Sequence, residues 1–155
     1  MRAFVSYSLN DRDELVMALL SAKLREKGFS ISMNYDFSSF VLTPMSQRMI
    51  NEANLFIGVI TKNSNDRERV IKEWNYAKSN NTPNILLLEE NMQVDNRLLQ
   101  GNYVVFNRKN PKNAVDEINR RMLPKNATEE FLPWALGGAA LLAVIGLLSS
   151  PSSRR

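Results

Sequence analysis

The side chains that could do chemistry in this sequence are carboxylates, hydroxyls, amides and cations, because the chain contains no cysteine and no histidine. This composition excludes disulfides, thiolate nucleophiles, the usual Cys/His zinc sites and a Ser-His-Asp triad, so we predict no metal site. Hydroxyl groups cluster at Ser6-Tyr7-Ser8 and between Thr61 and Ser64, each directly after an apolar run. Arg69 and Glu73 are spaced to lie on one face of a helix, where the arginine could pair with the carboxylate or with a substrate phosphate.

The elements that must position these residues alternate between strand-like and helix-like segments over residues 1–122, which is typical of a mainly parallel sheet covered by helices. We predict an α/β fold with a flavodoxin-like five-stranded parallel sheet in the order 2-1-3-4-5 and helices on both faces. Strands are expected around 3–5 and at 29–33, 55–60, 85–88 and 103–106, and helices at 11–27, 43–54, 67–80 and 111–122.

Strands one and three lie at the centre of such a sheet, where the direction of winding reverses, and ligands bind at the carboxyl ends of these strands. Ser6-Tyr7-Ser8 and the segment from Thr61 to Ser64 are expected at that edge. The first helix should be held to the sheet by its apolar positions and stopped by Gly28. These positions are Leu15, Val16, Leu19, Leu20 and Leu24.

The C-terminal part of the chain has a different composition. Residues 131–153 carry no charge, and 131–148 are almost wholly apolar, about the length needed to cross a hydrocarbon core of roughly 30 Å. After the domain at 1–122 we therefore predict a polar linker at 123–130, a transmembrane helix at 131–149 and a short tail at 150–155. A buried core helix is the alternative for the apolar run.

Such a segment would make the protein a single-pass membrane protein with a C-terminal anchor in membrane lipid and its N-terminal domain in the cytoplasm. Positive charges flank both ends of the segment, so charge alone decides the orientation only weakly. Ala135, Ala139 and Ala143 recur every four residues and would let two helices approach closely. Association of copies through this face is a hypothesis beside the plainer interpretation that alanine is common in membrane helices.

The net charge of +4 does not indicate nucleic-acid binding. Without Arg154 and Arg155 the chain has 18 basic and 16 acidic residues, a net charge of +2. Lysine and arginine nowhere form a run with interleaved aromatic residues, so we expect no nucleic-acid partner.

Three motifs resemble those of Toll/interleukin-1 receptor (TIR) domains. The run Phe4-Val5-Ser6-Tyr7-Ser8 followed by Asp11 resembles the first-strand motif of the family, and residues 56–61 resemble its third strand. The helix pattern then follows at Ser64, Val70, Glu73, Tyr76 and Ala77. The resemblance covers about residues 2–122 and is strongest to bacterial TIR-like proteins of antiphage defence, of the Thoeris type.

In catalytic members of this family the helix glutamate is essential for cleaving NAD at the nicotinamide–ribose bond, and the matching residue is Glu73. The resemblance thus implies an NAD glycohydrolase or ADP-ribosyl cyclase that uses NAD as substrate rather than cofactor and is active in a homo-oligomer. The predicted transmembrane helix would tether this enzyme to the membrane. The resemblance also places Ser6, Tyr7 and Ser8 near Glu73, together with Tyr35, Asp36 and Phe37 of the loop after strand two. Arg69 departs from the family, because many active members carry a tryptophan there.

Four alternatives stay open from the sequence, two for the whole protein and two for particular residues. The chain could be a non-catalytic TIR-like module that oligomerises, with the membrane helix as its anchor or as a disruptive effector. It could instead be a nucleoside deoxyribosyltransferase-like enzyme, since that related fold also cleaves N-glycosidic bonds with a carboxylate. For single residues, Glu73 could be a solvated helix carboxylate, and the run from Asp66 to Arg69 could be an ordinary salt-bridged surface.

Overall fold

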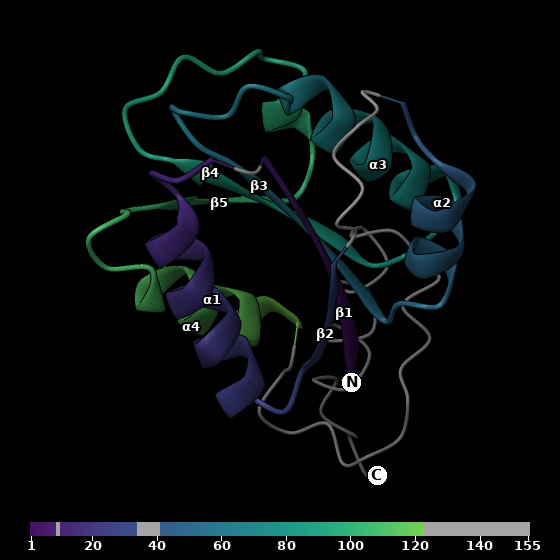
Figure 1. Cartoon of the computed structure of the whole chain (residues 1–155), viewed down its shortest axis with the longest axis horizontal. Helices are drawn as coiled ribbons and strands as arrows, with labels where there is room; N and C mark the ends of the chain where they lie inside the picture. The colour runs from purple at the N-terminus through teal and green to yellow at the C-terminus, as the bar shows by residue number, and fades with distance from the viewer. Residues whose placement is uncertain (9, 34–40, 123–155) are drawn as a thin grey trace, which may run out of the picture.

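The computed structural model describes residues 1–8, 10–33 and 41–122. Five parallel strands form one sheet in the order β2-β1-β3-β4-β5, as predicted. Figure 1 shows this sheet with α1 and α4 on one face and α2 and α3 on the other. The elements in chain order are β1 Arg2–Tyr7, α1 Glu14–Glu26, β2 Ser30–Met33, α2 Pro44–Asn51, β3 Leu55–Ile60, α3 Arg67–Ser79, β4 Asn84–Glu89, the short 3-10 helix η1 Leu98–Gln100, β5 Tyr103–Phe106 and α4 Lys112–Met122.

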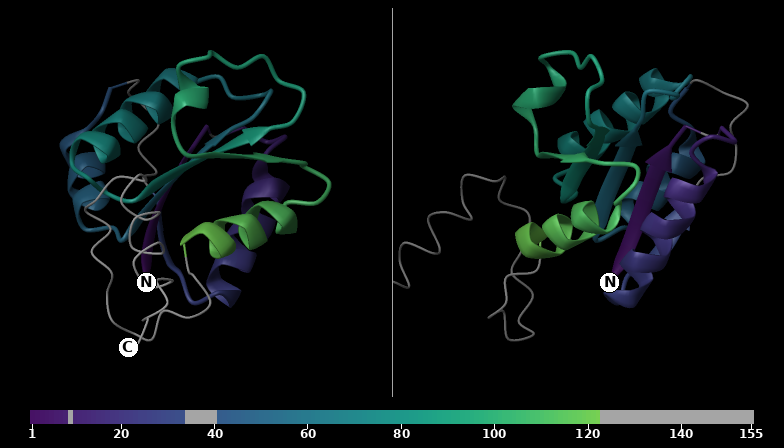
Figure 2. Two further views of the ribbon diagram at one scale, coloured as in Figure 1. Left: turned by 180° about the vertical axis from the view of Figure 1, so that it is seen from behind. Right: turned by 90° about the vertical axis from the view of Figure 1, so that its left-hand side faces the viewer.

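The central strands are continuous apolar runs because both faces of the sheet are covered. All six residues of β3 are buried, and so are five of the six residues of β4. Such runs are typical of parallel strands with helices on both sides. The two views of Figure 2 show the helices flanking the sheet in two layers.

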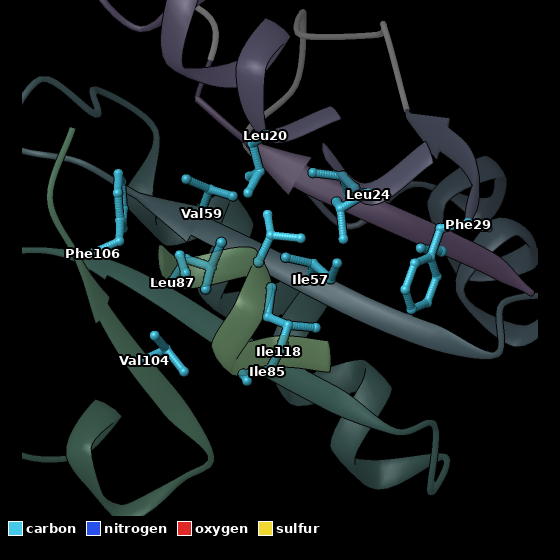
Figure 3. Close-up of a cluster of buried hydrophobic side chains, with 14 of the residues drawn as sticks. Leu20, Leu24, Phe29, Ile57, Val59, Ile85, Leu87, Val104, Phe106 and Ile118 are labelled. Carbon is cyan, nitrogen blue, oxygen red and sulfur yellow. The ribbon is translucent and has the colours of Figure 1, made fainter. Parts of the chain in front are cut away.

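Alternation along β1 directs its side chains to two separate cores. Ala3 and Val5 belong to the core under α1 and α4, whereas Phe4 belongs to the core under α2 and α3. Successive side chains of a strand point to opposite faces, so Ser6 follows Phe4 toward α2 and α3. The core under α1 and α4 is shown in Figure 3, where Leu20 and Leu24 lie over Ile57, Val59 and Leu87.

Helix α1 differs from the sequence prediction in its start and in its buried face. It begins at Glu14 rather than at residue 11, after a turn. Leu15 and Leu19 were expected in the core, and that expectation is wrong: 70% and 43% of their surfaces are exposed. A helix against a sheet buries one stripe, and this stripe runs through Val16, Met17, Leu20 and Leu24, which turns the other two leucines outward.

Helix α2 is shorter than predicted, since it ends at Asn51 rather than near residue 54. The backbone amide of Asn54 already donates a hydrogen bond to the carbonyl of Arg2 at 2.8 Å, so the chain must leave the helix before β3 begins. The remaining boundaries agree with the predicted ones within a few residues. Across 1–8, 10–33 and 41–122, no helix combines the length and apolar character needed to cross a membrane. The predicted linker, transmembrane segment and tail at 123–155 lie outside the described residues.

Candidate functional site

Glu73 lies on α3 and has no exposed surface. Its carboxylate accepts hydrogen bonds from three side chains that come from three different elements. Ser6 at the end of β1 donates its hydroxyl to Oε2, Ser46 of α2 donates to Oε1 at 2.6 Å, and Arg69 of α3 itself donates Nη1 to Oε2 at 3.2 Å. The interpretation of Glu73 as a solvated helix carboxylate is therefore wrong.

Ser6 reaches Glu73 because of the strand alternation that also places Phe4 in the α2/α3 core. It is 2% exposed and is the last buried residue of β1. The topology of the sheet thus brings the first-strand motif and the helix glutamate, 67 residues apart in the chain, into direct contact.

Arg69 ties this carboxylate to two further groups. Its Nε donates to Asp66 Oδ2 at 3.0 Å, and its Nη2 donates to the backbone carbonyl of Tyr7. Only 3% of its side chain is exposed. Of the two partners considered for Arg69, the structure thus shows Glu73, in a buried pair. The interpretation of residues 66–69 as an ordinary salt-bridged surface is therefore wrong for this arginine.

Ser46 was not identified from the sequence as a site residue. Thr43 caps α2 by accepting a hydrogen bond from the backbone amide of Ser46 at 3.1 Å, and Pro44 occupies the first turn, as the sequence predicted. This cap places Ser46 in the first turn of the helix, on the side that meets α3. The capping signal is local, and nothing in it indicates which side chain the serine will meet.

The other two predicted site residues that the structure describes, Tyr7 and Ser8, contact groups other than the Glu73 carboxylate. The Tyr7 ring packs against the core on the α1/α4 face. Ser8 Oγ accepts hydrogen bonds from the backbone amides of Asn65 at 3.0 Å and Asp66 at 3.5 Å, which fixes the start of α3. Tyr35, Asp36 and Phe37 lie outside the described residues.

A second polar network occupies the same edge of the sheet on its other side. Arg108, just after β5, donates hydrogen bonds to Asp13 Oδ1 at 2.8 Å and to Glu89 Oε1 at 2.8 Å. Thr61 donates its hydroxyl to Asp13 Oδ2, and the backbone amide of Lys62 donates to Glu89 Oε2 at 2.8 Å. Thr61 therefore belongs to this network through its hydrogen bond to Asp13 and is not among the donors to Glu73.

Hydrogen bonds and charges within this network shift the pKa values of its members. Burial by itself would raise the pKa of Asp13, but hydrogen bonds from Thr61, Asn10, Arg108 and Asn63 together lower it. Hydrogen bonds from Arg108 lower the pKa of Glu89, and the bonds to Glu89 raise the pKa of Arg108. The network joins the start of α1 to the ends of β3, β4 and β5, and we assign it a structural role.

A pocket of about 570 Å³ lies elsewhere, between β5 and α4. Glu117 and Arg121 are among its lining residues, and they are paired with each other at 2.6 Å. The three side chains that donate to Glu73 belong to other elements and do not line this pocket. The Glu73 cluster is a better site candidate than this pocket, because it lies at the carboxyl end of the central strand β1, where ligands bind in open parallel sheets.

Comparisons with known proteins bear on this arrangement. The sequence model of a family described as "TIR domain" matches residues 3–123. Among curated proteins, none matches the chain. Two similar solved structures are a 2-deoxyribosyltransferase of Bacillus psychrosaccharolyticus and the CMP N-glycosidase BcmB of Clostridium botulinum.

The first of these structures is 14% identical, with a TM-score of 0.58, over 73% of this chain and 91% of that chain. The second is 20% identical, with a TM-score of 0.55, over 77% of this chain and 99% of that chain. At such low identity the likeness establishes a shared fold and nothing finer.

Proposed function

Because the chain belongs to the TIR domain family, we propose that it is an NAD-consuming enzyme of bacterial antiphage defence or immune signalling, with Glu73 as its catalytic carboxylate. The observation that carries the proposal is the buried Glu73 carboxylate joined to Ser6 at the carboxyl end of β1. This end of the central strands is where ligands bind in open parallel sheets. In the catalytic TIR domains that this sequence resembles, the matching glutamate is essential.

The proposed reaction breaks the bond between the pyridinium nitrogen of NAD and C1′ of its ribose. The electron pair of that bond stays on the nitrogen, so nicotinamide leaves as a neutral molecule and needs no general acid. The ribose becomes an oxocarbenium ion, and a nearby carboxylate lowers its free energy electrostatically. Water then adds to C1′ and gives ADP-ribose with release of one proton, or a nucleophile within the ADP-ribose adds instead and gives a cyclised product.

The residues around Glu73 have separate parts in this proposal. Glu73 binds ribose hydroxyls and faces the cation. Arg69 keeps the carboxylate in place through their 3.2 Å contact. It also donates a hydrogen bond to the carbonyl of Tyr7, which fixes α3 relative to the end of β1. A substrate must open the site, because Glu73 has no exposed surface in this structure. We infer that assembly of copies brings this opening about, which would make the activity depend on protein density.

The test is nicotinamide release from NAD by the full chain in detergent at high protein density. We expect the wild type to release nicotinamide and Glu73→Gln to lose at least about a hundredfold in rate, because removal of one electrostatic stabiliser of a transition state typically costs this much. Glu68→Gln is the matched control: it makes the same change on the same helix, at an exposed position, and should keep the wild-type rate. A wild type as inert as Glu73→Gln refutes the enzymatic proposal.

A second enzymatic candidate is supported by the two structural neighbours, whose names describe a 2-deoxyribosyltransferase and a CMP N-glycosidase. On this alternative, Glu73 acts on the N-glycosidic bond of a nucleoside or nucleoside monophosphate. Incubation with CMP and with 2′-deoxynucleosides, followed by detection of the free base, separates the two candidates. Release of cytosine without release of nicotinamide favours this alternative.

A non-catalytic oligomerisation module is favoured by one observation: in the described structure each oxygen of Glu73 already accepts a hydrogen bond from the protein. On this alternative the Glu73 cluster only holds α2, α3 and β1 together. Loss of the biological effect in Glu73→Gln would then accompany a loss of folding stability, and no small-molecule product would form with the wild type.

We also propose that residues 131–149 anchor the domain in a membrane, since this run is uncharged and almost wholly apolar. Fractionation of expressing cells tests the anchor. The full chain should sediment with membranes and dissolve only in detergent, and a chain ending at Glu130 should remain in the soluble fraction. Recovery of both forms in the soluble fraction contradicts the anchor.

A further inference from the structure

We propose that the Ser46 hydroxyl holds, in this closed structure, the place at Glu73 Oε1 that a hydroxyl of the substrate ribose takes, so that Ser46 is a positioning residue which the substrate displaces. This inference rests on the proposed function, because it concerns how a riboside reaches the same carboxylate. It concerns a residue of α2 that lies outside the sequence motifs of the site.

The two oxygens of Glu73 are held differently. Oε2 accepts hydrogen bonds from Ser6 and Arg69, whereas Oε1 accepts one, from Ser46 at 2.6 Å, among the residues that the structure describes. Ser6 belongs to the central strand β1, and Arg69 lies one turn before Glu73 on the same helix. Exchange at Oε2 would have to displace two donors, one of them the cation Arg69, whereas exchange at Oε1 displaces a single neutral hydroxyl of the described residues. Oε1 is therefore the oxygen that can exchange its partner.

Helix α2 is the element able to make room. It has only eight residues, and its outer side is open to solvent, with 61% of Met45 exposed. Its direct hydrogen bonds to α3 within the described chain are Ser46 to Glu73 and Asn51 to the Tyr76 hydroxyl at 3.1 Å. A small displacement of α2 thus frees Oε1 without breaking a strand pairing.

The exchange is chemically balanced because one hydroxyl replaces another on the same carboxylate oxygen. In the closed structure the Ser46 hydroxyl donates to Oε1 and accepts from the Thr43 hydroxyl at 3.2 Å. A ribose hydroxyl is likewise both donor and acceptor. Without either hydroxyl, a buried carboxylate oxygen would lose its donor, which is unfavourable for a charged group.

This balance predicts an unusual effect of removing the serine hydroxyl. Ser46→Ala leaves Oε1 without its donor in the closed state, but leaves the ligand-bound state intact, because there the ribose supplies the donor. Since only the unliganded state is destabilised, the affinity for a riboside should increase, by about three- to tenfold. A merely structural serine would instead weaken ligand binding or leave it unchanged when replaced.

The experiment measures binding of ADP-ribose by titration calorimetry to the full chain in detergent, for wild type, Ser46→Ala and Ser21→Ala. ADP-ribose is the probe because it carries the ribose hydroxyls and has no nicotinamide bond to cleave. Ser21 is a matched control, being a 5% exposed serine of α1 under the opposite face of the sheet. We expect tighter binding for Ser46→Ala alone, together with a lower unfolding temperature without ligand and a larger rise in that temperature on addition of ADP-ribose.

Thr43→Val is the second variant, and it serves if Ser46→Ala does not fold. It removes the hydroxyl that orients Ser46 and should tighten binding in the same direction by a smaller factor. Equal or weaker affinity of the folded variants, or no ADP-ribose binding by any of the proteins, overturns the inference. The proposed function fails on a different result, the absence of nicotinamide release from NAD by the wild type, so the two failures are distinguishable.

Discussion

At the scale of single residues, Glu73 is a carboxylate without solvent contact, and taking such a group out of water costs several kcal/mol unless charges and hydrogen bonds compensate. Arg69 supplies the opposite charge, and Ser6 and Ser46 supply neutral donors. From the spacing, the sequence indicated Glu73 as one of two possible partners of Arg69, beside a substrate phosphate. It did not predict the burial, because spacing defines which helix face two residues share but does not define what covers that face.

We predict that this pair is strongly coupled. Arg69→Met should lower the free energy of unfolding by about 3 kcal/mol, since it leaves a buried carboxylate without its cation. In the double variant Arg69→Met with Glu73→Gln the loss should be smaller than the sum of the two single losses, because no unpaired charge remains. Chemical denaturation of the four proteins measures this coupling. Additive losses would contradict a direct interaction between the two side chains.

At the scale of elements, the site depends on where each side chain points along β1, α2 and α3. The alternation of β1 separates Ser6 from Tyr7, so that the hydroxyl meets Glu73 and the ring packs on the opposite face of the sheet. Strand alternation is readable from sequence, and the predicted boundaries of β3 and β5 agree with the observed ones. The rotation of α1 about its own axis could not be predicted from the sequence. Leu15 and Leu19 are as apolar as the residues that are buried, so the pattern did not show which face of the helix meets the sheet.

Two neighbouring leucines of α1 provide a matched test of that rotation. Leu20 is 2% exposed and lies in the core with Val59, whereas Leu19 is 43% exposed. We expect Leu20→Ala to lower the free energy of unfolding by about 2–4 kcal/mol through the cavity it creates, and Leu19→Ala to lower it by less than about 1 kcal/mol. Equal losses in urea denaturation would show that the helix is rotated differently.

At the scale of the whole molecule, the carboxyl edge of the sheet carries two polar centres on opposite sides. One is the Glu73 cluster, and the other is the network of Asp13, Glu89 and Arg108. The second centre ties the start of α1 to the ends of the strands, with Arg108 bonded to both carboxylates at 2.8 Å. It therefore stabilises the edge against which the β1 end and Ser6 are placed.

This network predicts how stability depends on pH. The pKa values of Asp13 and Glu89 are lowered below their ordinary values of 3.8 and 4.5, so both groups stabilise the fold above those values. Their contribution is lost as the pH falls through the lowered values of the folded state. Arg108→Met should lower the free energy of unfolding by about 1–3 kcal/mol at pH 7. The difference in unfolding free energy between this variant and wild type should become smaller below about pH 4, where the two carboxylates become protonated.

Thermal unfolding between pH 3 and pH 7 measures that difference. Arg97→Met is the control, because it removes an exposed arginine whose partner is Asp95, and it should leave the unfolding temperature nearly unchanged at both ends of the range. A constant difference between Arg108→Met and wild type over the whole range would mean that the arginine acts by packing rather than by charge.

The sequence by itself determined the order of elements, the parallel sheet and the helix face that Arg69 and Glu73 share, because hydrophobic periodicity, capping signals and helical spacing are local properties of the chain. Only the tertiary structure decided that Ser46 donates a hydrogen bond to Glu73, that Thr61 donates to Asp13, and that the Glu73 carboxylate is fully buried. These contacts depend on how helices are rotated and how far they lie above the sheet. Packing of both cores fixes those quantities, and no short stretch of sequence encodes them alone.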